Sequence, residues 1–412
     1  MKILIISQYF WPEAFRINEL AANLVERDNH VTVLAGIPNY PDGQFFKDYS
    51  VFKPFRETYK GIKIIRSPLI SRGASKGIRL VLNYLSFAFF ATLTGLLFCR
   101  EKYDVILVYQ PSPVTVGIPA VIMRMLKKIP VLFWVQDLWP ESLSATGAIK
   151  NAVILRAIAH MVKWIYRHCD LILIPSRAFK PQIERFGVNP AKIVYLPNSA
   201  EQIYQPVKLS GDAPEIKLMP NGGFKVMFAG NIGAAQDFET ILSAAEKLKN
   251  NNKIIHWLVL GDGRMRPWVE AEVKRREIQN CFHLLGKFPV ERMANFFSLA
   301  DVMLVTLKNS PIFSMTIPAK VQSYLACAKP IIAAVGGEGN SVIEEARAGI
   351  ACPPEDANAL AQAVLKMYEM RELARQQLGT NGRDYFMANF DSVHLINKLE
   401  TLIYKMTYEI PI

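Results

Sequence analysis

The segment FKVMFAGNIGAAQDFE, residues 224–239, carries an apolar run into a helical run through a turn that contains two glycines. The apolar run is typical of a buried strand, and the residues after Asp237 have the spacing of an amphipathic helix. A strand that turns through glycines into a helix is a common phosphate-binding arrangement, because free N–H groups at the helix start attract an anion. The GxGxxG fingerprint and the P-loop pattern are both absent. The turn therefore predicts either an anion site at the amides of Asn231 to Gly233 or a simple chain reversal.

The same alternation of apolar runs and helical segments extends over the whole chain, and it is typical of parallel sheets with helices on both faces. In the first half, the expected strands are residues 2–7, 30–36, 62–67, 104–110, 130–137, 170–176 and 192–199. In the second half, they are residues 225–230, 254–261, 281–286, 301–307 and 329–334. The sequence therefore predicts an α/β protein with doubly wound sheets.

The length of the chain favours two domains, because 412 residues are too many for one ordinary hydrophobic core. Residues 201–222 are rich in Pro, Gly and polar residues without a clear period, and we expect them to form the linker. The expected domains are then two Rossmann-like units, residues 1–200 and 223–390. Residues 391–412 are expected to form a final helix, and the N-terminal domain is one surface on which it can pack.

The cysteine and histidine residues form no recognisable ligand set. The five cysteines are scattered without a CxxC pair, which argues against a disulfide framework and a zinc site and fits a reducing cytoplasm. The six histidines show no HExxH or paired spacing. The N-terminal apolar run is too short for a signal peptide and is expected to be the first strand. We therefore expect a protein that is not exported and that has no metal site.

The net charge of +12 is compatible with several anionic partners. The basic residues are dispersed and no nucleic-acid recognition motif is present, so we expect no nucleic-acid partner. An anionic membrane surface and a small anionic molecule fit the charge equally well.

The stretch from Leu80 to Phe98, LVLNYLSFAFFATLTGLLF, contains no charged residue and has Lys or Arg on both sides. Its length is sufficient to span a bilayer. A span would, however, place the first strands of one sheet across the membrane from the next strand. We therefore expect a helix near 76–102 that packs partly on the sheet and places an apolar face in one leaflet. A wholly buried core helix is the alternative.

Other turns at the ends of expected strands carry basic residues. Lys320 follows Pro318 in the first turn of an expected helix, where a positive charge is unfavourable, so it is either an anion-binding lysine or a solvated surface residue. The turns LGDGRMR and LGKFP add Arg264, Lys287 and Phe288. Together these turns predict a partly basic rim that would bind a nucleotide better than a metal.

In the first half of the chain, the segment WVQDLWPES, residues 134–142, follows an expected strand. Its carboxylates, Asp137 and Glu141, could contact a sugar or assist proton transfer. The alternative is that Asp137 caps the helix that follows.

The order of these segments resembles a known family. The segments YFWPEAFRINELAANL, DNHVTVLAGIPNYPDG, WVQDLWPES, YLPNS, FAGNIGAAQD, LGDG, DVMLVTL and IPAKVQSYLACAKPIIA follow one another as in the family 4 glycosyltransferases of the GT-B fold. The resemblance covers essentially the full chain. Within that family, PNYPDG and DLWPES are similar to the branch of L-fucosamine (N-acetylfucosamine) transferases of bacterial O-antigen and capsule synthesis.

The resemblance implies a GT-B fold, in which two Rossmann-like domains face each other across a cleft. It implies a sugar nucleotide in the C-terminal domain, an acceptor in the N-terminal domain, retention at the anomeric carbon, and neither a cofactor nor a metal. The donor-binding positions that it carries over are Asn231, Gly233, Gln236, Lys287, Phe288 and Lys320. On the N-terminal side it carries over the first loop, Glu13 to Arg16, which faces the donor.

The chain departs from the family pattern at two positions. Many members carry Glu-x7-Glu, in which the first glutamate meets the donor sugar and the second meets the ribose hydroxyls. Here these places fall at Met315 and Ser323, and the histidine that members often have near VQDLW is also missing. A donor sugar without a 6-hydroxyl group is one hypothesis for these changes, with the ribose held elsewhere, for example by Glu344 or Glu345.

From the resemblance we expect transfer of an N-acetyl-6-deoxyhexosamine, such as N-acetyl-L-fucosamine, from a UDP-sugar to a polyprenyl-diphosphate-linked acceptor. Lys320, Arg264 and the turn amides would stabilise the leaving UDP, and Asp137 and Glu13 are further catalytic candidates. The expected location is peripheral, at the cytoplasmic face of the inner membrane. Two alternatives stay open: a UDP-N-acetylhexosamine epimerase with the same fold, and a non-catalytic partner in an envelope assembly complex.

Overall fold

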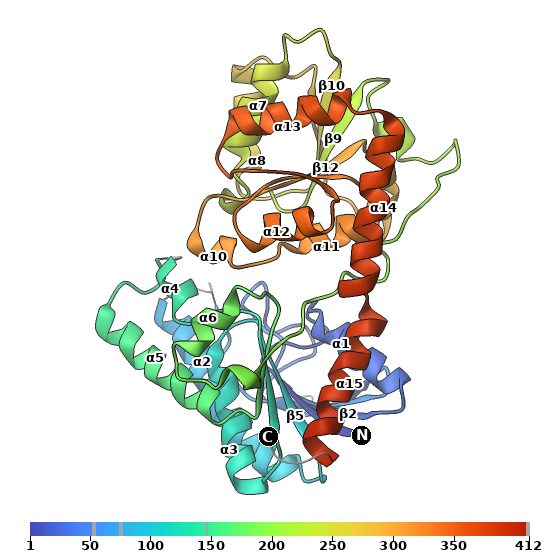
Figure 1. Ribbon diagram of the computed structural model, residues 1–412. Coiled ribbons are helices and arrows are strands. Elements are labelled where there is room, and N and C mark those ends of the chain that lie inside the picture. Colours follow the sequence, from blue (N-terminus) through green and yellow to red (C-terminus); the bar gives the residue numbers. More distant parts are fainter. Residues whose placement is uncertain (52–54, 74–76, 146, 409–412) are drawn as a thin grey trace. The chain divides into compact units, whose positions relative to one another are not determined.

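The computed structural model describes residues 1–51, 55–73, 77–145 and 147–408. The chain divides into two compact units. Unit 1 contains Met1–Leu196 and the final helix from Ile396 on, and unit 2 contains Pro197–Leu395. Each unit has its own sheet covered by helices (Figure 1).

Unit 1 is built on an eight-stranded sheet with the order β3-β4-β2-β1-β5-β6-β7-β8. Its strands are β1 Lys2–Ser7, β2 His30–Gly36, β3 Arg56–Tyr59, β4 Ile62–Ser67, β5 Val105–Gln110, β6 Val131–Val135, β7 Leu171–Ile174 and β8 Ile193–Tyr195. All neighbouring strands are parallel except β3 and β4. Its helices are α1 Ile17–Glu26, α2 Gly77–Phe98, α3 Gly117–Lys127, α4 Glu141–Ala145, α5 Ala152–Arg167, α6 Phe179–Glu184 and most of α15, Ser392–Tyr408.

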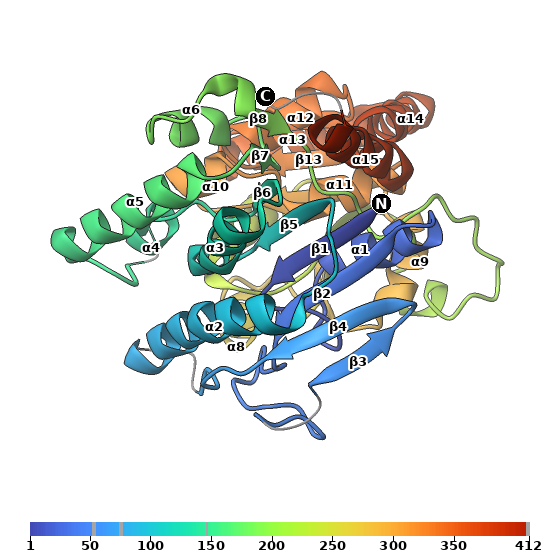
Figure 2. The same cartoon turned by 90° about the horizontal axis from the view of Figure 1, so that it is seen from below.

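The interior strands of unit 1 coincide with the apolar runs because both faces of this sheet are covered. Strands β5 and β6 are buried at every residue, and β1 and β2 are buried at all but the first. Helix α1 packs on one face with α15 beside it, and α2, α3 and α5 lie on the other face (Figure 2). Strand β3, with the sequence RETY, was not expected, because it is a short polar edge strand without an apolar run.

Unit 2 is built on a six-stranded parallel sheet with the order β11-β10-β9-β12-β13-β14. Its strands are β9 Phe224–Ala229, β10 Ile255–Leu260, β11 Phe282–Gly286, β12 Val302–Thr306, β13 Ile331–Ala334 and β14 Gly349–Cys352. Its helices are α7 Phe238–Leu248, α8 Arg266–Arg275, α9 Met293–Ser298, α10 Pro311–Ser314, α11 Ala319–Ala326, α12 Glu338–Glu345, α13 Ala357–Glu369 and α14 Glu372–Asn389. Strand β14 was not expected, since its four residues, GIAC, are too few for a clear pattern.

The segment expected to be a linker, residues 201–222, belongs to unit 2. Its Glu215 is buried and accepts a hydrogen bond from Arg292 Nε at 2.6 Å. Its Tyr204 stacks on Phe297 with ring centroids 5.8 Å apart. The polar composition of the segment therefore does not mark a free linker, because a few anchoring residues hold it on the core of unit 2.

The final helix α15 contacts unit 1 through polar and apolar residues. Glu400 accepts hydrogen bonds from Arg27 Nε at 2.9 Å and from Asn29 Nδ2 at 2.7 Å. Leu399 and Ile403 are fully or almost fully buried. The final helix therefore packs on the N-terminal domain, the surface named in the sequence analysis.

Helix α2 is neither wholly buried nor free of the sheet. One stripe, formed by Asn83, Phe87, Ala88, Ala91, Thr94 and Gly95, is buried. The other side leaves large apolar side chains exposed, at Ile78, Val81, Leu82, Leu85, Phe89, Phe90, Leu93, Leu97 and Phe98. Among the described residues, α2 is the one helix long and apolar enough to cross a membrane. The alternative of a wholly buried core helix is therefore wrong, and the expected first residue, Lys76, lies outside the described residues.

Candidate functional site

Three glycine turns of unit 2 interlock at the carboxyl ends of β9, β10 and β11. The N–H of Gly230 donates to Leu260 O at 2.8 Å, and the N–H of Gly261 donates to Gly286 O at 2.7 Å. A Cβ at Gly261 would lie 1.9 Å from Gly230 O, and one at Gly263 would lie 2.4 Å from Ile232 O. These two glycines are therefore required for the turns to approach each other this closely.

The turn of residues 230–233 presents fewer amides than expected. The Ile232 N–H donates to Asp262 O at 2.8 Å, so this amide is not available to an anion. The N–H groups of Asn231 and Gly233 have no hydrogen-bond partner in the described parts of the chain. Of the three amides from Asn231 to Gly233 that were expected to meet an anion, those of Asn231 and Gly233 are thus available.

Lys320 lies in the first turn of α11 and directs its side chain beneath this turn. A Cβ at Gly230 would lie 2.6 Å from Lys320 Cε, so the close approach depends on a glycine. The Nζ lies 3.5 Å from the centroid of the Phe228 ring and donates a hydrogen bond to Gln236 Oε1. The alternative of a solvated surface lysine is therefore wrong.

The charge of Lys320 is not neutralised by an acidic partner. Burial lowers the pKa of its ammonium well below the ordinary value, and no carboxylate raises it. Lys320 forms no ion pair within the described residues, 1–51, 55–73, 77–145 and 147–408. A half-buried ammonium beside two unused amides is a site where an anion would gain both hydrogen bonds and charge neutralisation.

Gln236 holds this lysine in place. It ends the short 3₁₀ turn Ala234–Gln236, and its carbonyl oxygen accepts a hydrogen bond from Thr306 Oγ1 at 2.5 Å. Gln236, one of the donor-binding positions that the family resemblance carries over, is therefore the hydrogen-bond acceptor for Lys320.

The other basic residues expected on the rim lie on the neighbouring turns of unit 2. Arg264 is exposed between β10 and α8, and Lys287 is exposed after β11. Phe288 packs on Phe296 with ring centroids 4.5 Å apart, and the guanidinium of Arg292 lies 5.3 Å from its ring. Phe288 is thus held as one side of an apolar surface at the end of β11.

The positions that lack the family glutamates lie on α10 and α11. Met315 follows α10 and is partly exposed, whereas Ser323 is buried in α11 and its hydroxyl donates to Ala319 O at 3.3 Å. Ser323 is therefore turned into its own helix rather than toward a ligand.

The carboxylates suggested as ribose ligands, Glu344 and Glu345, lie at the last residues of α12. This helix begins at Glu338 after β13, so Glu344 and Glu345 lie about 10 Å farther along the helix axis. Glu345 also accepts a hydrogen bond from Tyr385 Oη at 2.8 Å. Glu338, which sequence reasoning missed, is the acidic residue of this helix at the carboxyl edge of the sheet.

In unit 1, Glu13 joins two loops at the carboxyl ends of β1 and β2. The residue is 2% exposed, and its Oε1 accepts the N–H groups of Asn39 and Tyr40, each at 2.8 Å. Its Oε2 accepts the N–H of Phe10 at 3.2 Å. Burial raises the pKa of Glu13 to about 7, although these hydrogen bonds oppose the change. The geometry therefore supports a positioning role for Glu13 rather than the expected contact with substrate.

Asp137 lies after β6 and has two partners of its own. Its Oδ2 accepts a hydrogen bond from Trp139 Nε1 at 3.0 Å. Burial raises the pKa of Asp137 to about 6, and hydrogen bonds from Ser142 and Trp139 oppose this shift. The side chain of Ser142 ties Asp137 to α4, whereas the backbone N–H of Ser142 donates to Leu138 O at 2.8 Å. The raised pKa of Asp137 also suits a proton-transfer group near neutral pH.

An aromatic cluster at the same edge of unit 1 was missed by the sequence analysis. Tyr9 stacks on Phe15 with centroids 5.0 Å apart, and Tyr40 lies 5.6 Å from Tyr9. The Arg72 guanidinium lies 5.0 Å from the Tyr40 ring, and its Nη1 donates to Tyr9 Oη at 2.9 Å. The Arg72 Nε is buried without a hydrogen-bond partner among the described residues. The predicted Arg16 adjoins this edge, where its charge acts on the hydroxyl of Tyr109.

The two units match two glycosyltransferase families. Residues 14–199 match "Glycosyl transferase 4-like domain", and residues 223–370 match "Glycosyl transferases group 1". The chain belongs to the GT-B glycosyltransferases. The expected fold class is therefore confirmed: two Rossmann-like α/β domains with largely parallel sheets.

This glycosyltransferase is similar to curated bacterial glycosyltransferases and to solved structures of the same fold. It is 26% identical over 355 residues to the probable glycosyltransferase WbjE of Pseudomonas aeruginosa, with 84% of each chain covered. It is 23% identical to the putative colanic acid biosynthesis glycosyl transferase WcaI of Escherichia coli K12, with 79% of this chain and 81% of WcaI covered. The structure of Anabaena HepE in complex with UDP-glucose superposes with a TM-score of 0.66 at 16% identity, covering 98% of this chain and 99% of HepE.

Proposed function

We propose that this glycosyltransferase moves a sugar from a UDP-sugar to a saccharide linked to polyprenyl diphosphate, with retention at the anomeric carbon. The observation that carries the donor assignment is the ammonium of Lys320, which is held by Gln236 and has no acidic partner among the described residues, beside the amides of Asn231 and Gly233. Arg264 adds a second cation on the adjacent turn. HepE, with the same fold, binds UDP-glucose, and a nucleoside diphosphate is the ligand class that these groups suit.

In the proposed mechanism the protein stabilises the leaving group. Lys320, Arg264 and the two amides bind the diphosphate, whose negative charge grows as the bond between the anomeric carbon and the phosphate oxygen breaks. The acceptor oxygen forms the new bond on the same face of the sugar. Its proton passes to a phosphate oxygen of the donor, and Asp137 is a second group that could accept it.

The proposed donor is an N-acetyl-6-deoxyhexosamine such as N-acetyl-L-fucosamine. Met315 supports this choice, because a thioether side chain suits a methyl group at C6 better than a hydroxyl. Glu338 is the carboxylate that we assign to the ribose hydroxyls, in place of the buried Ser323.

The proposed acceptor site is the aromatic edge of unit 1. The planes of Tyr9 and Tyr40 suit the apolar face of a sugar ring, and the guanidinium of Arg72 suits the diphosphate of a lipid carrier. The similarity to WcaI, a putative colanic acid biosynthesis glycosyl transferase, supports a place in polysaccharide synthesis of the O-antigen or capsule type.

We further propose that the protein is peripheral at the cytoplasmic face of the inner membrane. The exposed apolar side of α2 supports this location, since its buried stripe holds the helix to the sheet. Residues 58–170 contain 15 Lys and Arg but 5 Asp and Glu, so the sequence around this helix would be attracted to anionic lipids.

The proposal is tested by thermal unfolding with millimolar UDP, with ADP, GDP and NAD as controls, followed by transfer assays. A rise in melting temperature that is specific to UDP supports the donor assignment. Sugar transfer to a polyprenyl-diphosphate-linked saccharide then supports the full reaction. Turnover of UDP-N-acetylhexosamine without an acceptor indicates the epimerase, and no response to any nucleotide indicates the non-catalytic partner.

A further inference from the structure

One turn of α2 is fixed by polar contacts to the loops that follow β1 and β4. Asn83 is fully buried, its Oδ1 accepts a hydrogen bond from Gln8 Nε2 at 2.7 Å, and its Nδ2 donates to Ile70 O at 2.6 Å. Ser86 Oγ accepts the N–H of Ile70 at 2.9 Å. Because Gln8 follows β1 and Ile70 follows β4, this turn of α2 lies at the carboxyl edge of the unit 1 sheet, as the proposed acceptor site does.

Tyr84, in the same turn, extends these contacts to the aromatic cluster of the proposed acceptor site. The hydroxyl groups of Tyr84 and Tyr9 are joined by a hydrogen bond. Tyr9 is buried, and its Oη also accepts a hydrogen bond from Arg72 Nη1 at 2.9 Å. The orientation of Tyr9 is therefore set by Arg72 and Tyr84, because a buried hydrogen-bond network rigidifies the groups that form it.

The ring of Tyr84 reaches a third segment, which follows β6. It lies edge-on to the ring of Trp139, with centroids 6.1 Å apart and an interplanar angle of 63°. Trp139 is buried, and its Nε1 donates to Asp137 Oδ2 at 3.0 Å. Tyr84 thus contacts the acceptor cluster through its hydroxyl and, through its ring, the tryptophan that holds the proposed proton acceptor.

One polar group of this network has no partner among the described residues. Arg72 Nε is buried and makes no hydrogen bond, although Nη1 of the same guanidinium donates to Tyr9. A buried donor without a partner is costly, and an anionic group of a ligand would satisfy it. Since Tyr84 and Tyr9 hold the guanidinium that carries this unused donor, they also set where such a group can bind.

Packing alone does not explain the hydroxyl of Tyr84. The side chain is half-buried, whereas its neighbours on the buried stripe of α2, Asn83 and Phe87, are fully buried. A phenylalanine at position 84 would supply the same edge-on contact with Trp139. The hydroxyl is therefore the part of this residue for which a function has to be found.

We propose that Tyr84 is a positioning residue of the acceptor site, which orients Tyr9 and Arg72 for the lipid-linked substrate. This role rests on the proposed acceptor site and adds to it the residue that connects the site to α2. The same helix exposes Leu85 and Phe89, which the proposed location places in the lipid. The diphosphate and the hydrocarbon chain of one acceptor would then both lie beside α2.

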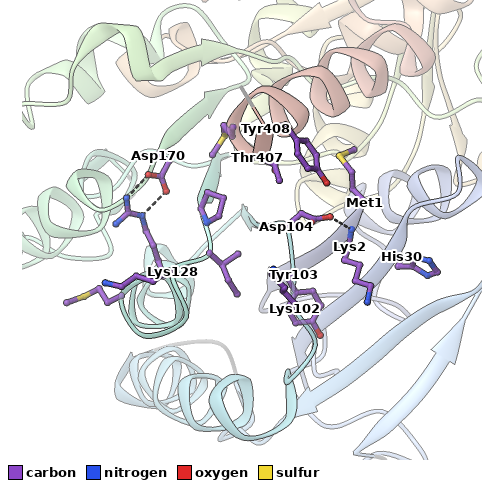
Figure 3. A pocket seen from close by; sticks show the side chains of 15 residues that line it. Met1, Lys2, His30, Lys102, Tyr103, Asp104, Lys128, Asp170, Thr407 and Tyr408 are labelled. Carbon is purple, nitrogen blue, oxygen red and sulfur yellow. Dashed lines mark hydrogen bonds and ion pairs between the residues drawn. The ribbon is translucent and has the colours of Figure 1, made fainter. Parts of the chain in front are cut away.

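The test compares Tyr84→Phe with Tyr103→Phe. Both variants remove one hydrogen-bonded phenol hydroxyl from unit 1 and keep the ring. Tyr103 lies at the opposite, amino edge of the same sheet, where it lines the cavity shown in Figure 3. Binding of farnesyl diphosphate, which carries the diphosphate and an isoprenoid chain of the proposed acceptor, is measured by calorimetry. UDP is present at saturation, so that the probe does not occupy the donor site.

We expect Tyr84→Phe to weaken binding of farnesyl diphosphate about threefold to tenfold, and Tyr103→Phe to leave it unchanged within about twofold. Neither variant should change the Kd of UDP. In transfer assays, Tyr84→Phe should raise the KM of the acceptor and leave kcat within about twofold of the wild type. Equal effects of the two variants, or no effect of Tyr84→Phe, would overturn the proposal.

A double-mutant cycle shows whether Tyr84 acts through Tyr9. Tyr9→Phe and Tyr84→Phe together should weaken binding no more than Tyr9→Phe alone, because the Tyr84 hydroxyl then has no partner left to hold. Effects that multiply would show two independent hydroxyls and would also overturn the proposal.

Failure of the proposed function gives a different result. A wild type that binds UDP but not farnesyl diphosphate would refute the acceptor site, and the role of Tyr84 with it. A wild type that does not bind UDP would refute the donor assignment, and the two tyrosine variants would then be compared without UDP. Failure of the Tyr84 proposal alone leaves binding of both ligands to the wild type intact.

Discussion

Replacement of Lys320 by methionine should remove UDP binding while leaving the fold at least as stable as before. Methionine has similar length and no charge, so it keeps the packing on Phe228 and removes the ammonium that meets no carboxylate. Removal of a half-buried charge should stabilise the folded variant. Loss of the hydrogen bond to Gln236 Oε1 should cost little, because Gln236 is partly exposed and its side chain can bind water instead. We expect the melting temperature of the free variant to be unchanged or raised by a few degrees.

The loss in binding can be worked out from the contacts. Removal of one partner of a charge-assisted contact in a desolvated site costs about 2–4 kcal/mol, or roughly 30- to 1000-fold in Kd. At a UDP concentration of about 100 times the wild-type Kd, the ligand stabilises the wild type by about 2.7 kcal/mol. A variant with a Kd about 100-fold higher would gain only about 0.4 kcal/mol at the same concentration. The UDP-induced shift in melting temperature should therefore almost disappear.

The pH dependence of UDP binding provides a second readout. Since the pKa of Lys320 in the free folded protein is lowered, this residue loses its proton at a lower pH than in the unfolded chain, and folding stability rises with pH between the two pKa values. A bound diphosphate favours the charged form, so binding takes up a proton and weakens as the pH rises above the lowered pKa. Calorimetry in buffers of different ionisation enthalpy measures this proton uptake.

The matched control is Lys308→Met, which removes an exposed lysine from the same edge of unit 2. This control should keep the UDP-induced shift and the proton uptake of the wild type. A Lys320→Met protein that still binds UDP within about threefold of the wild type would show that the ammonium does not face the diphosphate. A variant that is clearly less stable than the wild type would refute the reasoning on its uncompensated charge.

Three further predictions concern other residues. Because the folded pKa of Glu13 is raised to about 7, the free energy of unfolding of the wild type should fall between about pH 4.5 and about pH 7. Glu13→Gln should remove this fall, which urea unfolding across the pH range measures. The same pH dependence of unfolding in the wild type and the variant would contradict the prediction. The double change Leu85→Glu and Phe89→Glu should abolish binding to anionic vesicles and leave UDP binding intact, whereas Leu373→Glu, at an exposed apolar residue of unit 2, should affect neither. Gly261→Ala should destabilise unit 2 by about 2–4 kcal/mol in chemical unfolding, since its Cβ would lie 1.9 Å from Gly230 O; a change below about 0.5 kcal/mol would mean that the turns are not interlocked.

The sheets could be predicted from the sequence because each interior strand is an apolar run between turn residues. The two strands that were missed, β3 and β14, are four residues each and lie at sheet edges, where one side is not paired and the apolar pattern is weak. The contacts of segment 201–222 could not be predicted for a related reason, since single contacts such as Glu215 with Arg292 hold it to unit 2 and no periodic pattern records them.

The candidate site could be predicted in its positions but not in its electrostatics. Lys320 was found from its unfavourable place at a helix start, yet its burial depends on Phe228, Gly230 and Gln236, which are far away in the sequence. The Ile232 amide illustrates the same limit, because its partner is a carbonyl oxygen on the next turn. Local patterns identify which residues reach the edge of a sheet, and long-range packing decides which of their polar groups stay unused.

The contacts of α15 have a consequence for the order in which the protein can fold during synthesis. Unit 1 includes both Met1–Leu196 and the helix from Ile396 on, with Glu400 bonded to Arg27 and Asn29. The ribosome therefore completes all of unit 2 before it releases the helix that finishes unit 1. During that interval the surface that receives Leu399 and Ile403 is uncovered, and a nascent chain or a truncated product would offer this apolar surface to chaperones and proteases.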